Sequence, residues 1–371
     1  MRVVIDAVPL LIRSAGVKNY LYYWISHLRL AAGSGVCDTF PALDPLGPLR
    51  HEASIAGWGR TVTSLASLAI ANYTPLPVLD LAIGRADVFH ATNLVRHPPR
   101  RPRLTTTLHD MTSWLMPEFH PRANRRADAA HADLLRRADG IIAVSASTRD
   151  DAVRILGIPA ERIAVIHSGV AEAFFRSDPK SVEAVRARYK LARPYVLFVG
   201  TIEPRKNVDG MLDAWESLPS TVRDEFELVI AGPIGWASPK TAARVRGMRY
   251  LGYVAEADLA PLTAGATVFA YPSLYEGFGF PVAQAMASGV PVITSNVSSL
   301  PEITQDAALL ADPRSQAELR EGLLRLLTSP GLRAELAIRG RARAGNFRWE
   351  RCAAESWKFF EKIAGESASS R

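Results

Sequence analysis

An acidic residue in a glycine-rich turn is the clearest chemical signal in this chain. Residues 271–293 read YPSLYEGFGFPVAQAMASGVPVI, with Glu276 just ahead of Gly277 and Gly279. Glycines let the backbone approach a ligand closely, and Pro281 suits the first turn of a following helix. A helix N-terminus attracts anions, while a carboxylate accepts hydrogen bonds from hydroxyls. The pattern predicts a site for an anionic, hydroxylated ligand; the alternative is a tight connection with a surface glutamate.

Two adjacent cations precede another predicted helix. The segment GTIEPRKNVDGMLDAW leaves an apolar run at Gly200 and carries Arg205 and Lys206. An arginine matches pairs of phosphate oxygens, and a lysine adds a compact charge. This pair suits a diphosphate. The alternative is a solvated basic turn capped by Asn207.

The first half of the chain offers two weaker candidates. His109 and Asp110 end the run RLTTTLHD. A histidine there lines a reaction centre, or it is a structural residue held by Asp110. Gly16, in the segment GVKNY, lets the backbone approach a phosphate, and Lys18 would add charge.

Several familiar sites are absent from the sequence. No G-x-G-x-x-G follows a predicted strand, and there is no Walker-type motif, H-E-x-x-H or G-x-S-x-G. No Asp-x-Asp pair occurs, which removes the commonest carboxylate arrangement for a metal-held nucleotide diphosphate. The charge of a diphosphate would then be met by Arg205, Lys206 and backbone N–H groups.

Alternating strands and helices must position these residues. Such alternation predicts βαβ units and parallel sheets. Helices are expected between the strands, for example over 122–138. The predicted strands cover 3–8, 86–92, 103–110, 140–145, 163–170, 195–200, 227–232, 266–273 and 290–295. Ligands bind beyond the carboxyl ends of such strands, where the candidate residues lie.

The pattern occurs twice and predicts two doubly wound α/β domains that face each other across a cleft. The first covers 1–176, a polar linker covers 177–193, and the second covers 194–351. The amphipathic C-terminal segment, about 352–371, is a helix that we expect to pack back onto the first domain. A chain of 371 residues is long enough for two such cores.

Composition indicates a soluble globular protein, with 48% hydrophobic and 22% charged residues. Cys37 and Cys352 are too far apart in sequence to suggest a disulfide framework or a metal site. Asp6 interrupts the apolar N-terminus, so a strand fits better than a signal peptide. No apolar run reaches the roughly 20 residues of a membrane span. We therefore expect a cytoplasmic protein.

Positive charge is concentrated in one stretch. The net charge is +7, and RHPPRRPR, from Arg96 to Arg103, is its densest basic cluster, with more arginines over 122–137. Such a cluster attracts anionic lipid or phosphorylated substrates; the alternative is a solvated arginine-rich surface. No aromatic residues are interleaved with the arginines, which argues against nucleic acid. We therefore keep the hypothesis that this cluster makes peripheral contact with an anionic inner membrane face.

Taken together, these segments resemble the retaining glycosyltransferases of family 4, which are nucleotide-sugar-dependent enzymes of the GT-B fold. The resemblance covers nearly the whole chain and rests on GVKNY, TLHDMTSWLMPEF, AVSASTRDD, VIHSGV, EPRKN, LGYV, the glutamate loop and FRWE. Bacterial members of this family carry motifs similar to GTxEPRKN and LHD. Many of these members are mannosyltransferases, and they act in polysaccharide, lipopolysaccharide or natural-product glycosylation.

The resemblance implies two Rossmann-like domains, an N-terminal one on the acceptor side and a C-terminal one that binds the nucleotide sugar. A hexosyl unit, mannose or glucose, would pass from a nucleoside diphosphate sugar to an acceptor hydroxyl with retention. The acceptor would be a saccharide, a lipid-linked sugar or a small molecule. Front-face attack, without metal or cofactor, is the implied mechanism.

The resemblance also implies roles for individual residues. The catalytic set would be Arg205 and Lys206 on the diphosphate, Glu276 on the 3- and 4-hydroxyls of the sugar, and His109 at the reaction centre. The donor-binding set would be Gly16 near the phosphates, the backbone N–H groups of Phe278 and Gly279, Tyr253 and Val254 beside the base, and Gln284. Ser145 would have a mainly structural role.

Gln284 departs from the family pattern, which has Glu, seven residues and a second Glu that binds the ribose hydroxyls. A glutamine bonds a diol without charge assistance, which weakens donor binding by about 1 kcal/mol. Two other functions stay open: a nucleotide-sugar epimerase or hydrolase on the same fold, and a non-catalytic nucleotide-sugar-binding protein, for which Gln284 is the only hint.

Overall fold

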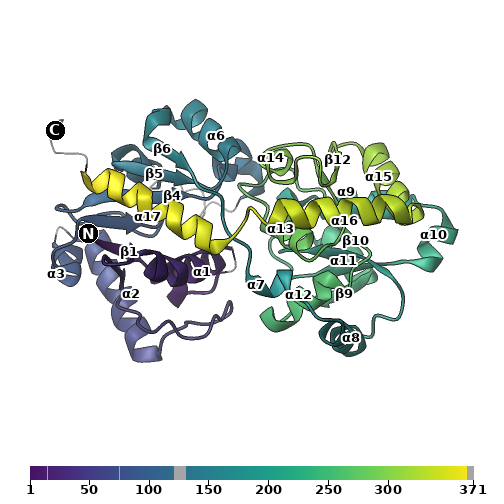
Figure 1. The fold of residues 1–371 in the computed structure, drawn as a ribbon, viewed down its shortest axis with the longest axis horizontal. Helices are drawn as coiled ribbons and strands as arrows, with labels where there is room; N and C mark the ends of the chain where they lie inside the picture. The colour runs from purple at the N-terminus through teal and green to yellow at the C-terminus, as the bar shows by residue number, and fades with distance from the viewer. Residues whose placement is uncertain (15, 75, 121–130, 366–371) are drawn as a thin grey trace. The chain divides into compact units, whose positions relative to one another are not determined.

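The chain forms two compact units in the computed structural model, which describes residues 1–14, 16–74, 76–120 and 131–365 (Figure 1). Unit 1 comprises Met1–Gly169 and the C-terminal helix that begins at Trp349. Unit 2 comprises Val170–Arg348. Across the described residues, no helix is both long and apolar enough to cross a membrane.

Unit 1 is built on a parallel sheet of six strands in the order β2-β1-β3-β4-β5-β6. The strands are β1 (Arg2–Asp6), β2 (Val36–Phe40), β3 (Val88–Ala91), β4 (Arg103–Leu108), β5 (Gly140–Ala143) and β6 (Ile163–Val165). The inner strands β3 and β5 are buried along their whole length. Burial on both faces is typical of parallel sheets covered by helices.

The helices of unit 1 include one from each end of the chain. Those with both ends among the described residues are η1 (Val8–Leu11), α1 (Gly16–Ala31), α2 (Trp58–Tyr73), α3 (Val78–Ile83), α4 (Thr112–Leu115), η2 (Pro117–Phe119), α6 (Ala146–Leu156), η3 (Ala160–Arg162) and α17 (Trp349–Gly365). Helix α17 packs against α1, where Trp24 Nε1 donates to Ser356 Oγ at 3.0 Å. The C-terminal helix therefore completes the core of the first unit.

Unit 2 repeats the architecture with a parallel six-stranded sheet in the order β12-β11-β10-β7-β8-β9. Its strands are β7 (Tyr195–Val199), β8 (Glu227–Ala231), β9 (Arg249–Gly252), β10 (Val268–Tyr271), β11 (Val292–Ser295) and β12 (Leu309–Ala311). Its helices are α7 (Glu172–Phe175), α8 (Pro179–Arg188), η4 (Pro204–Lys206), α9 (Val208–Glu216), α10 (Ser220–Glu225), α11 (Pro239–Gly247), α12 (Glu256–Ala264), α13 (Phe280–Ala287), α14 (Leu300–Thr304), α15 (Gln316–Thr328) and α16 (Pro330–Ala344).

The two doubly wound parallel sheets confirm the predicted fold class. The segment 177–193 differs from the expected polar linker, because most of it forms α8 and packs within unit 2. Asp178 caps α8 through the backbone N–H groups of Lys180 and Ser181, and Val185 is buried. Residues 131–137 of the helix expected over 122–138 are helical, and 121–130 lie outside the described residues.

The strand order of unit 2 places a topological switch point between β7 and β10. From β7 the chain first adds β8 and β9 on one side, and then returns to add β10, β11 and β12 on the other. In doubly wound sheets the loops at such a point diverge and leave a crevice at the carboxyl ends of the strands. The loops after β7 and β10 carry the cation pair and the glutamate turn.

Candidate functional site

The loops after β7 and β10 meet, although they are distant in sequence. Leu274 N–H donates to Arg205 O at 2.8 Å, and Arg205 Nη1 donates to Tyr275 O at 3.0 Å. Asn207, in the left-handed conformation with φ 53°, ends η4 and begins α9. These contacts fix the cation pair against the turn that holds Glu276.

Glu276 lies inside a buried ion cluster. Its Oε1 accepts from Lys206 Nζ at 2.5 Å, and its Oε2 lies 3.1 Å from Arg205 Nη1. Arg205 Nη2 also donates to Glu203 Oε1 at 2.6 Å. The side chains of Glu203, Arg205, Lys206 and Glu276 are exposed by only 5–15%. This burial excludes both the solvated basic turn and the surface glutamate considered above.

Serine hydroxyls hold the Glu276 turn in place. Ser273 Oγ donates to Glu276 Oε1 at 2.7 Å. The Glu276 N–H donates to Ser298 Oγ at 2.9 Å, and Ser299 Oγ donates to Glu276 O at 3.0 Å. Side chain and backbone of Glu276 are thus fixed from separate segments, so the carboxylate has a defined direction.

The electrostatics of the cluster keep the carboxylate ionised. Burial by itself would raise the pKa of Glu276, but the charges of Lys206 and Arg205 outweigh it and lower that pKa to about 2. Burial lowers the pKa of Lys206, and neighbouring Arg205 lowers it further, while Glu276 opposes the shift. At neutral pH the carboxylate is therefore a hydrogen-bond acceptor and not a proton donor.

Helix α13 begins directly after the Glu276 turn. Gly279 precedes it with φ +91°, and a Cβ there would lie 2.7 Å from Leu300 Cδ2. Phe278 is buried, with its ring 5.2 Å from that of Phe280. Gln284 lies on the same helix, partly exposed. The structure thus places the Glu276 turn at the N-terminus of α13, which carries Gln284.

The remaining donor-binding candidates of unit 2 follow β9. Tyr253 is 47% exposed, whereas Val254 is buried at 4%. Gly252, with φ +66°, turns the chain just before them. The Tyr253 ring is therefore accessible to a ligand, while Val254 contributes to the core.

His109 lies in unit 1 and is not held by Asp110. Asp110 Oδ1 instead accepts from the N–H and Oγ1 of Thr112 at the start of α4. The His109 ring packs edge-on against Tyr20, with centroids 4.8 Å apart. Burial lowers the pKa of His109 to about 4, with Asp110 opposing. The imidazole is neutral at pH 7 and offers one donor and one acceptor nitrogen.

Gly16 and Lys18 have different surroundings at the start of α1. A Cβ at Gly16 would meet nothing within 4 Å, so a ligand has room to approach its backbone. Lys18 is fully buried, and its Nζ donates to Ile12 O and Ala53 O at 2.7 Å each. The Lys18 ammonium therefore ties two backbone segments together, and its contribution of charge to a phosphate site stays a prediction.

Ser145 has a structural role at the start of α6. It is fully buried, and its Oγ accepts from Thr148 N–H at 3.1 Å, so it caps the helix. Arg96, Arg100 and Arg101 of the basic cluster are exposed, whereas Arg103 pairs with Asp139 at 3.0 Å.

Sequence reasoning missed two acidic residues near sheet ends. Glu203 stood in the EPRKN segment without a role, although its position two residues before Arg205 was a local signal for an ion pair. Asp6 ends β1, where Thr92 Oγ1 and Val8 N–H donate to it. Burial raises the pKa of Asp6 to about 6 despite those hydrogen bonds. No motif identified this buried carboxyl group.

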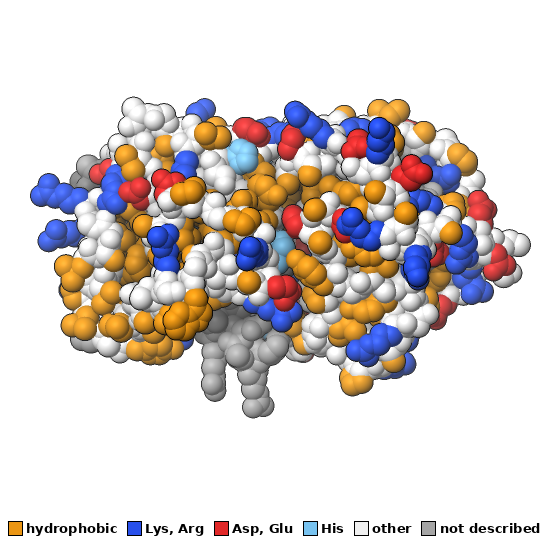
Figure 2. All heavy atoms as spheres, turned by 90° about the horizontal axis from the view of Figure 1, so that it is seen from below, with side chains coloured by type: hydrophobic (Ala, Val, Ile, Leu, Met, Phe, Trp, Pro, Cys, Tyr) orange, Lys and Arg blue, Asp and Glu red, His pale blue; other side chains and the backbone are white. Residues whose placement is uncertain are grey.

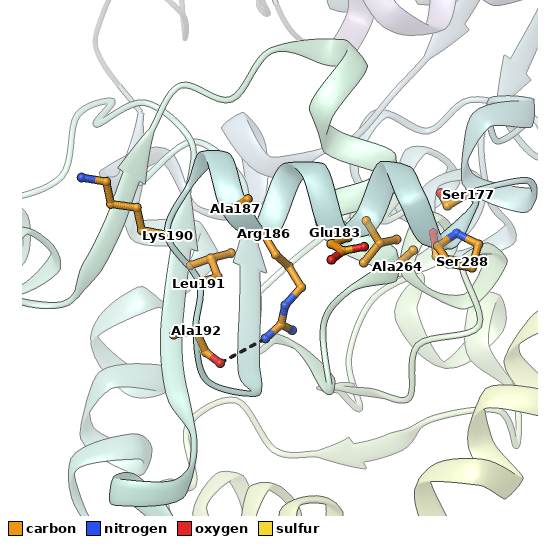
Figure 3. Close-up of a pocket in the computed structure, with 11 residues that line it drawn as sticks. Ser177, Glu183, Arg186, Ala187, Lys190, Leu191, Ala192, Ala264 and Ser288 are labelled. Carbon is orange, nitrogen blue, oxygen red and sulfur yellow. Dashed lines mark hydrogen bonds between the residues drawn. The ribbon is translucent and has the colours of Figure 1, made fainter.

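A separate cavity of about 660 Å³ lies elsewhere in unit 2. Figure 3 shows Glu183, Arg186 and Lys190 of the α8 region around it, together with Ala264 and Ser288. Ser288 follows the C-terminal end of α13, the helix whose N-terminus adjoins Glu276. None of the ion-cluster residues lines this cavity.

Two family models match the chain. "Glycosyltransferase Family 4" matches residues 40–174, and "Glycosyl transferases group 1" matches residues 183–343. The chain is 34% identical over 346 residues to the O-antigen chain mannosyltransferase B of Escherichia coli, and the match covers 90% of both proteins.

Solved structures share the fold at low sequence identity. Sucrose-phosphate synthase from Thermosynechococcus elongatus has a TM-score of 0.72 at 20% identity, over 99% of this chain and 100% of that one. HepE from Anabaena, in complex with UDP and glucose, has a TM-score of 0.71 at 17% identity, over 98% of this chain and 100% of that one.

Proposed function

The chain belongs to glycosyltransferase family 4 and is a hexosyltransferase of the GT-B fold, and we propose that it transfers mannose with retention from a nucleoside diphosphate sugar. The acceptor hydroxyl would belong to a saccharide, free or lipid-linked. The mannosyltransferase that is 34% identical over 90% of this chain supports mannose over glucose. The UDP and glucose in the HepE complex support a nucleotide-sugar donor.

The observation that carries the proposal is the ionised Glu276 beside two buried cations. A glycosyl diphosphate carries its hydroxyls and its phosphate oxygens on directly bonded groups. Its binding site therefore needs hydrogen-bond acceptors and cations close together. Glu276 lies within 3.1 Å of both Lys206 and Arg205. In the proposed complex the sugar hydroxyls donate to Glu276, and the phosphate oxygens accept from Lys206, Arg205 and the N–H groups ahead of α13.

The proposed reaction needs no protein nucleophile. The bond between the anomeric carbon and the diphosphate breaks, and the acceptor oxygen bonds that carbon on the same face. The acceptor proton passes to the departing phosphate oxygen. Lys206 and Arg205 stabilise the negative charge that develops there, which is the largest contribution that a preorganised site makes. We propose that these cations meet that charge without a metal ion or cofactor.

The rival epimerase or hydrolase would need a carboxyl group able to exchange protons near neutral pH. Glu276 does not suit that role, because its pKa is about 2. Asp6 has a pKa of about 6, but its carboxyl group is fully buried and held by Val8 and Thr92. Glu203 is bound to Arg205. These ion pairs favour group transfer, in which the carboxylates bind and orient the substrate. A non-catalytic binding protein would bind the donor without turnover.

The test begins with a thermal-shift panel of nucleoside diphosphates and their sugars, because a ligand of the folded state raises the melting temperature. The best donor is then incubated with saccharide acceptors, and the anomeric configuration of the product is determined by NMR. We expect an α-linked mannoside from an α-linked donor. Inversion, or release of free or epimerised sugar in the presence of acceptor, would contradict the proposal.

We also propose that the protein acts in the cytoplasm and contacts the inner membrane face through Arg96–Arg103. Exposed arginines attract anionic lipid over about one Debye length. A lipid-linked acceptor would be presented at such a surface. Sedimentation with anionic vesicles tests the contact separately from sugar transfer.

A further inference from the structure

Helix α2 exposes an apolar face to solvent. Its sequence, WGRTVTSLASLAIANY, contains no acidic residue and a single arginine. Along the exposed side, hydrophobic residues recur at helical spacing: Trp58 is 83% exposed, Val62 44%, Ile70 45% and Tyr73 71%. A helix on the surface of a soluble protein normally turns polar residues outward. This helix does the opposite.

The apolar surface continues onto α3. Leu76, in the connection, is 57% exposed, and Leu81 is 80% exposed. We define the α2–α3 face as Trp58, Val62, Ile70, Tyr73, Leu76 and Leu81. These are six of the twelve large hydrophobic side chains exposed among the described residues. In Figure 2 orange side chains gather over the side of the molecule that carries α2.

The inner side of α2 explains why the helix forms despite this exposure. Ser64, Leu68 and Ala71 are buried, and the helix packs against α3 and η1. Ser64 Oγ donates to Arg60 O within the helix at 2.6 Å. Only this narrow stripe of α2 packs into the core, so the exposed side chains of the helix do not contribute to core packing. Clustered apolar exposure of this kind marks an interaction surface.

Arginines flank one end of the α2–α3 face. The Arg96 guanidinium lies over the Tyr73 ring, 5.0 Å from its centroid. A cavity of about 660 Å³ is bordered by Tyr73 and Leu76 and by Arg100 and Arg137. The adjoining cavity, about 580 Å³, shares Arg137 and adds Arg96 and Arg136. Among the residues that the structure describes, Asp80 and Asp133 are the acidic ones that line these two cavities. The apolar face therefore runs into a surface of net positive charge.

We propose that the α2–α3 face enters the headgroup region of an anionic bilayer and that the cavity between Tyr73 and Arg100 takes a lipid phosphate. Tryptophan and tyrosine favour the membrane interface, and apolar side chains beside basic ones are what interfacial helices use. This inference rests on the proposed membrane contact, in which the arginines supply the attraction to anionic lipid. The α2–α3 face adds an apolar surface for insertion that the arginines alone do not supply.

The positive charges beside the α2–α3 face argue against a second copy of the chain as the partner that binds it. A two-fold dimer would place the same patch on both partners. The net positive charge of both copies, from the arginines at positions 96, 100, 136 and 137, would then be brought into one interface. Like charges brought together in an interface are costly. An anionic lipid surface, in contrast, satisfies both the apolar residues and the arginines.

The test uses the full-length protein and sedimentation with vesicles of phosphatidylcholine alone or with phosphatidylglycerol. We expect binding to the anionic vesicles only. Trp58→Ser and Leu81→Ser together should weaken it at least tenfold, because burying one large apolar side chain is worth about tenfold or more in affinity. Arg100→Glu should weaken binding and reduce its salt dependence. A brominated lipid should quench Trp58 fluorescence, and Trp58→Phe should abolish that part of the quenching.

Leu30→Ser is the matched control, because Leu30 is 81% exposed on α1 of the same unit. It should leave vesicle binding unchanged. Equal binding by the parent and the Trp58→Ser, Leu81→Ser variant overturns the proposal, as does a lipid-free dimer that this variant dissociates. Transfer to a soluble acceptor should persist in the variant. Loss of vesicle binding with intact transfer separates this inference from the proposed reaction.

Discussion

The buried carboxylates Glu203 and Glu276 balance the charges of Arg205 and Lys206 before any donor is bound. A balanced cluster avoids the large cost of an unpaired buried charge. Donor binding must therefore redistribute hydrogen bonds, since the phosphates add negative charge beside two existing carboxylates. The sugar hydroxyls compensate by donating to Glu276.

Glu276→Gln should lower turnover by roughly 10²–10³, the effect of removing one preorganised catalytic group. It should also destabilise the protein by about 3 kcal/mol, because Lys206 loses its buried counter-charge. Initial rates at saturating donor and urea unfolding measure the two effects. The pair Lys206→Met with Glu276→Gln should recover stability but not turnover. Turnover near that of the parent protein in folded Glu276→Gln would remove the sugar-binding role.

Glu203→Gln should separate binding from catalysis. Removing one carboxylate leaves the cluster with net positive charge, so a nucleoside diphosphate should bind a few-fold more tightly. Arg205 loses its 2.6 Å partner and with it part of its orientation, so kcat should fall by about tenfold or more. Calorimetry and steady-state kinetics measure this split. Parallel losses in affinity and kcat would contradict the positioning role.

Gln284→Glu should improve donor binding by about fivefold, because a charged acceptor gains about 1 kcal/mol on hydroxyl groups. Gln284 is partly exposed on α13, so the added charge remains hydrated in the free protein. Calorimetric titration with the donor measures the gain. The matched control is a donor with 2′-deoxyribose, for which the gain should shrink. An equal gain with both donors would place Gln284 away from the ribose.

Edge elements are where prediction and structure differ most. The three strands without a prediction, β2, β9 and β12, all lie at sheet edges. Edge strands pair on one side only and tolerate exposed residues, as in β9, where no residue is buried. Their hydrophobic pattern is accordingly weak. Inner strands such as β5, β7 and β8 gave clear apolar runs.

Three histidines with lowered pKa values make unit 1 sensitive to acid. Burial lowers the pKa values of His90, His109 and His131 to about 3, 4 and 4. The unfolded chain takes up these protons near pH 6.5, so the stability of unit 1 falls as pH drops from about 6.5 to about 4. Asp6 opposes this loss, since its raised pKa stabilises the folded state below about pH 6.

Urea unfolding at pH 7.0 and 4.5 should therefore show unit 1 losing several kcal/mol, since three groups each contribute about 1.4 kcal/mol per unit of pH. The lowered pKa of Glu276 keeps its contribution to unit 2 intact until the pH falls below 4.5. Proteolysis of the partly unfolded protein identifies the unit that opens first. His131→Gln should reduce the pH dependence. Unit 2 opening first at pH 4.5 would contradict this assignment.

The chain as a whole passes between the units twice. Gly169 is the last residue of unit 1 before the first passage, and a Cβ there would lie 2.4 Å from Trp349 N, where the second passage enters α17. Next to it, Val170 N–H donates to Phe347 O at 2.9 Å within unit 2. Only glycine at position 169 lets the two connecting segments run this close together. Unit 1 is therefore completed only after unit 2 has been synthesised.

Truncation after Arg348 should unfold unit 1 and leave unit 2 folded. The lost helix buries Trp349, Trp357, Phe359 and Phe360. Each large aromatic side chain is worth about 3–5 kcal/mol, so the four together contribute about as much as, or more than, the roughly 5–15 kcal/mol that stabilises a domain. Circular dichroism should show partial loss of helix, while a nucleoside diphosphate still raises the melting temperature of unit 2. A fully folded truncated protein would contradict this dependence.

Local sequence patterns are enough to predict the two doubly wound sheets and the loops that carry the candidate residues. Alternating periodicity, glycine turns and helix starts are local properties, and the family motifs are contiguous segments. These local signals suffice to place Arg205, Lys206 and Glu276 in the loops that follow strands.

How those residues meet follows from the folded arrangement of distant segments. Lys206 and Glu276 are 70 positions apart, yet their charged atoms lie 2.5 Å from each other. The burial of Lys18, the pairing of Glu203 and the exposed apolar side of α2 likewise depend on packing between distant segments. Desolvation and ion pairing are set by neighbours in space, so the charge state of the site follows from the fold and not from local sequence.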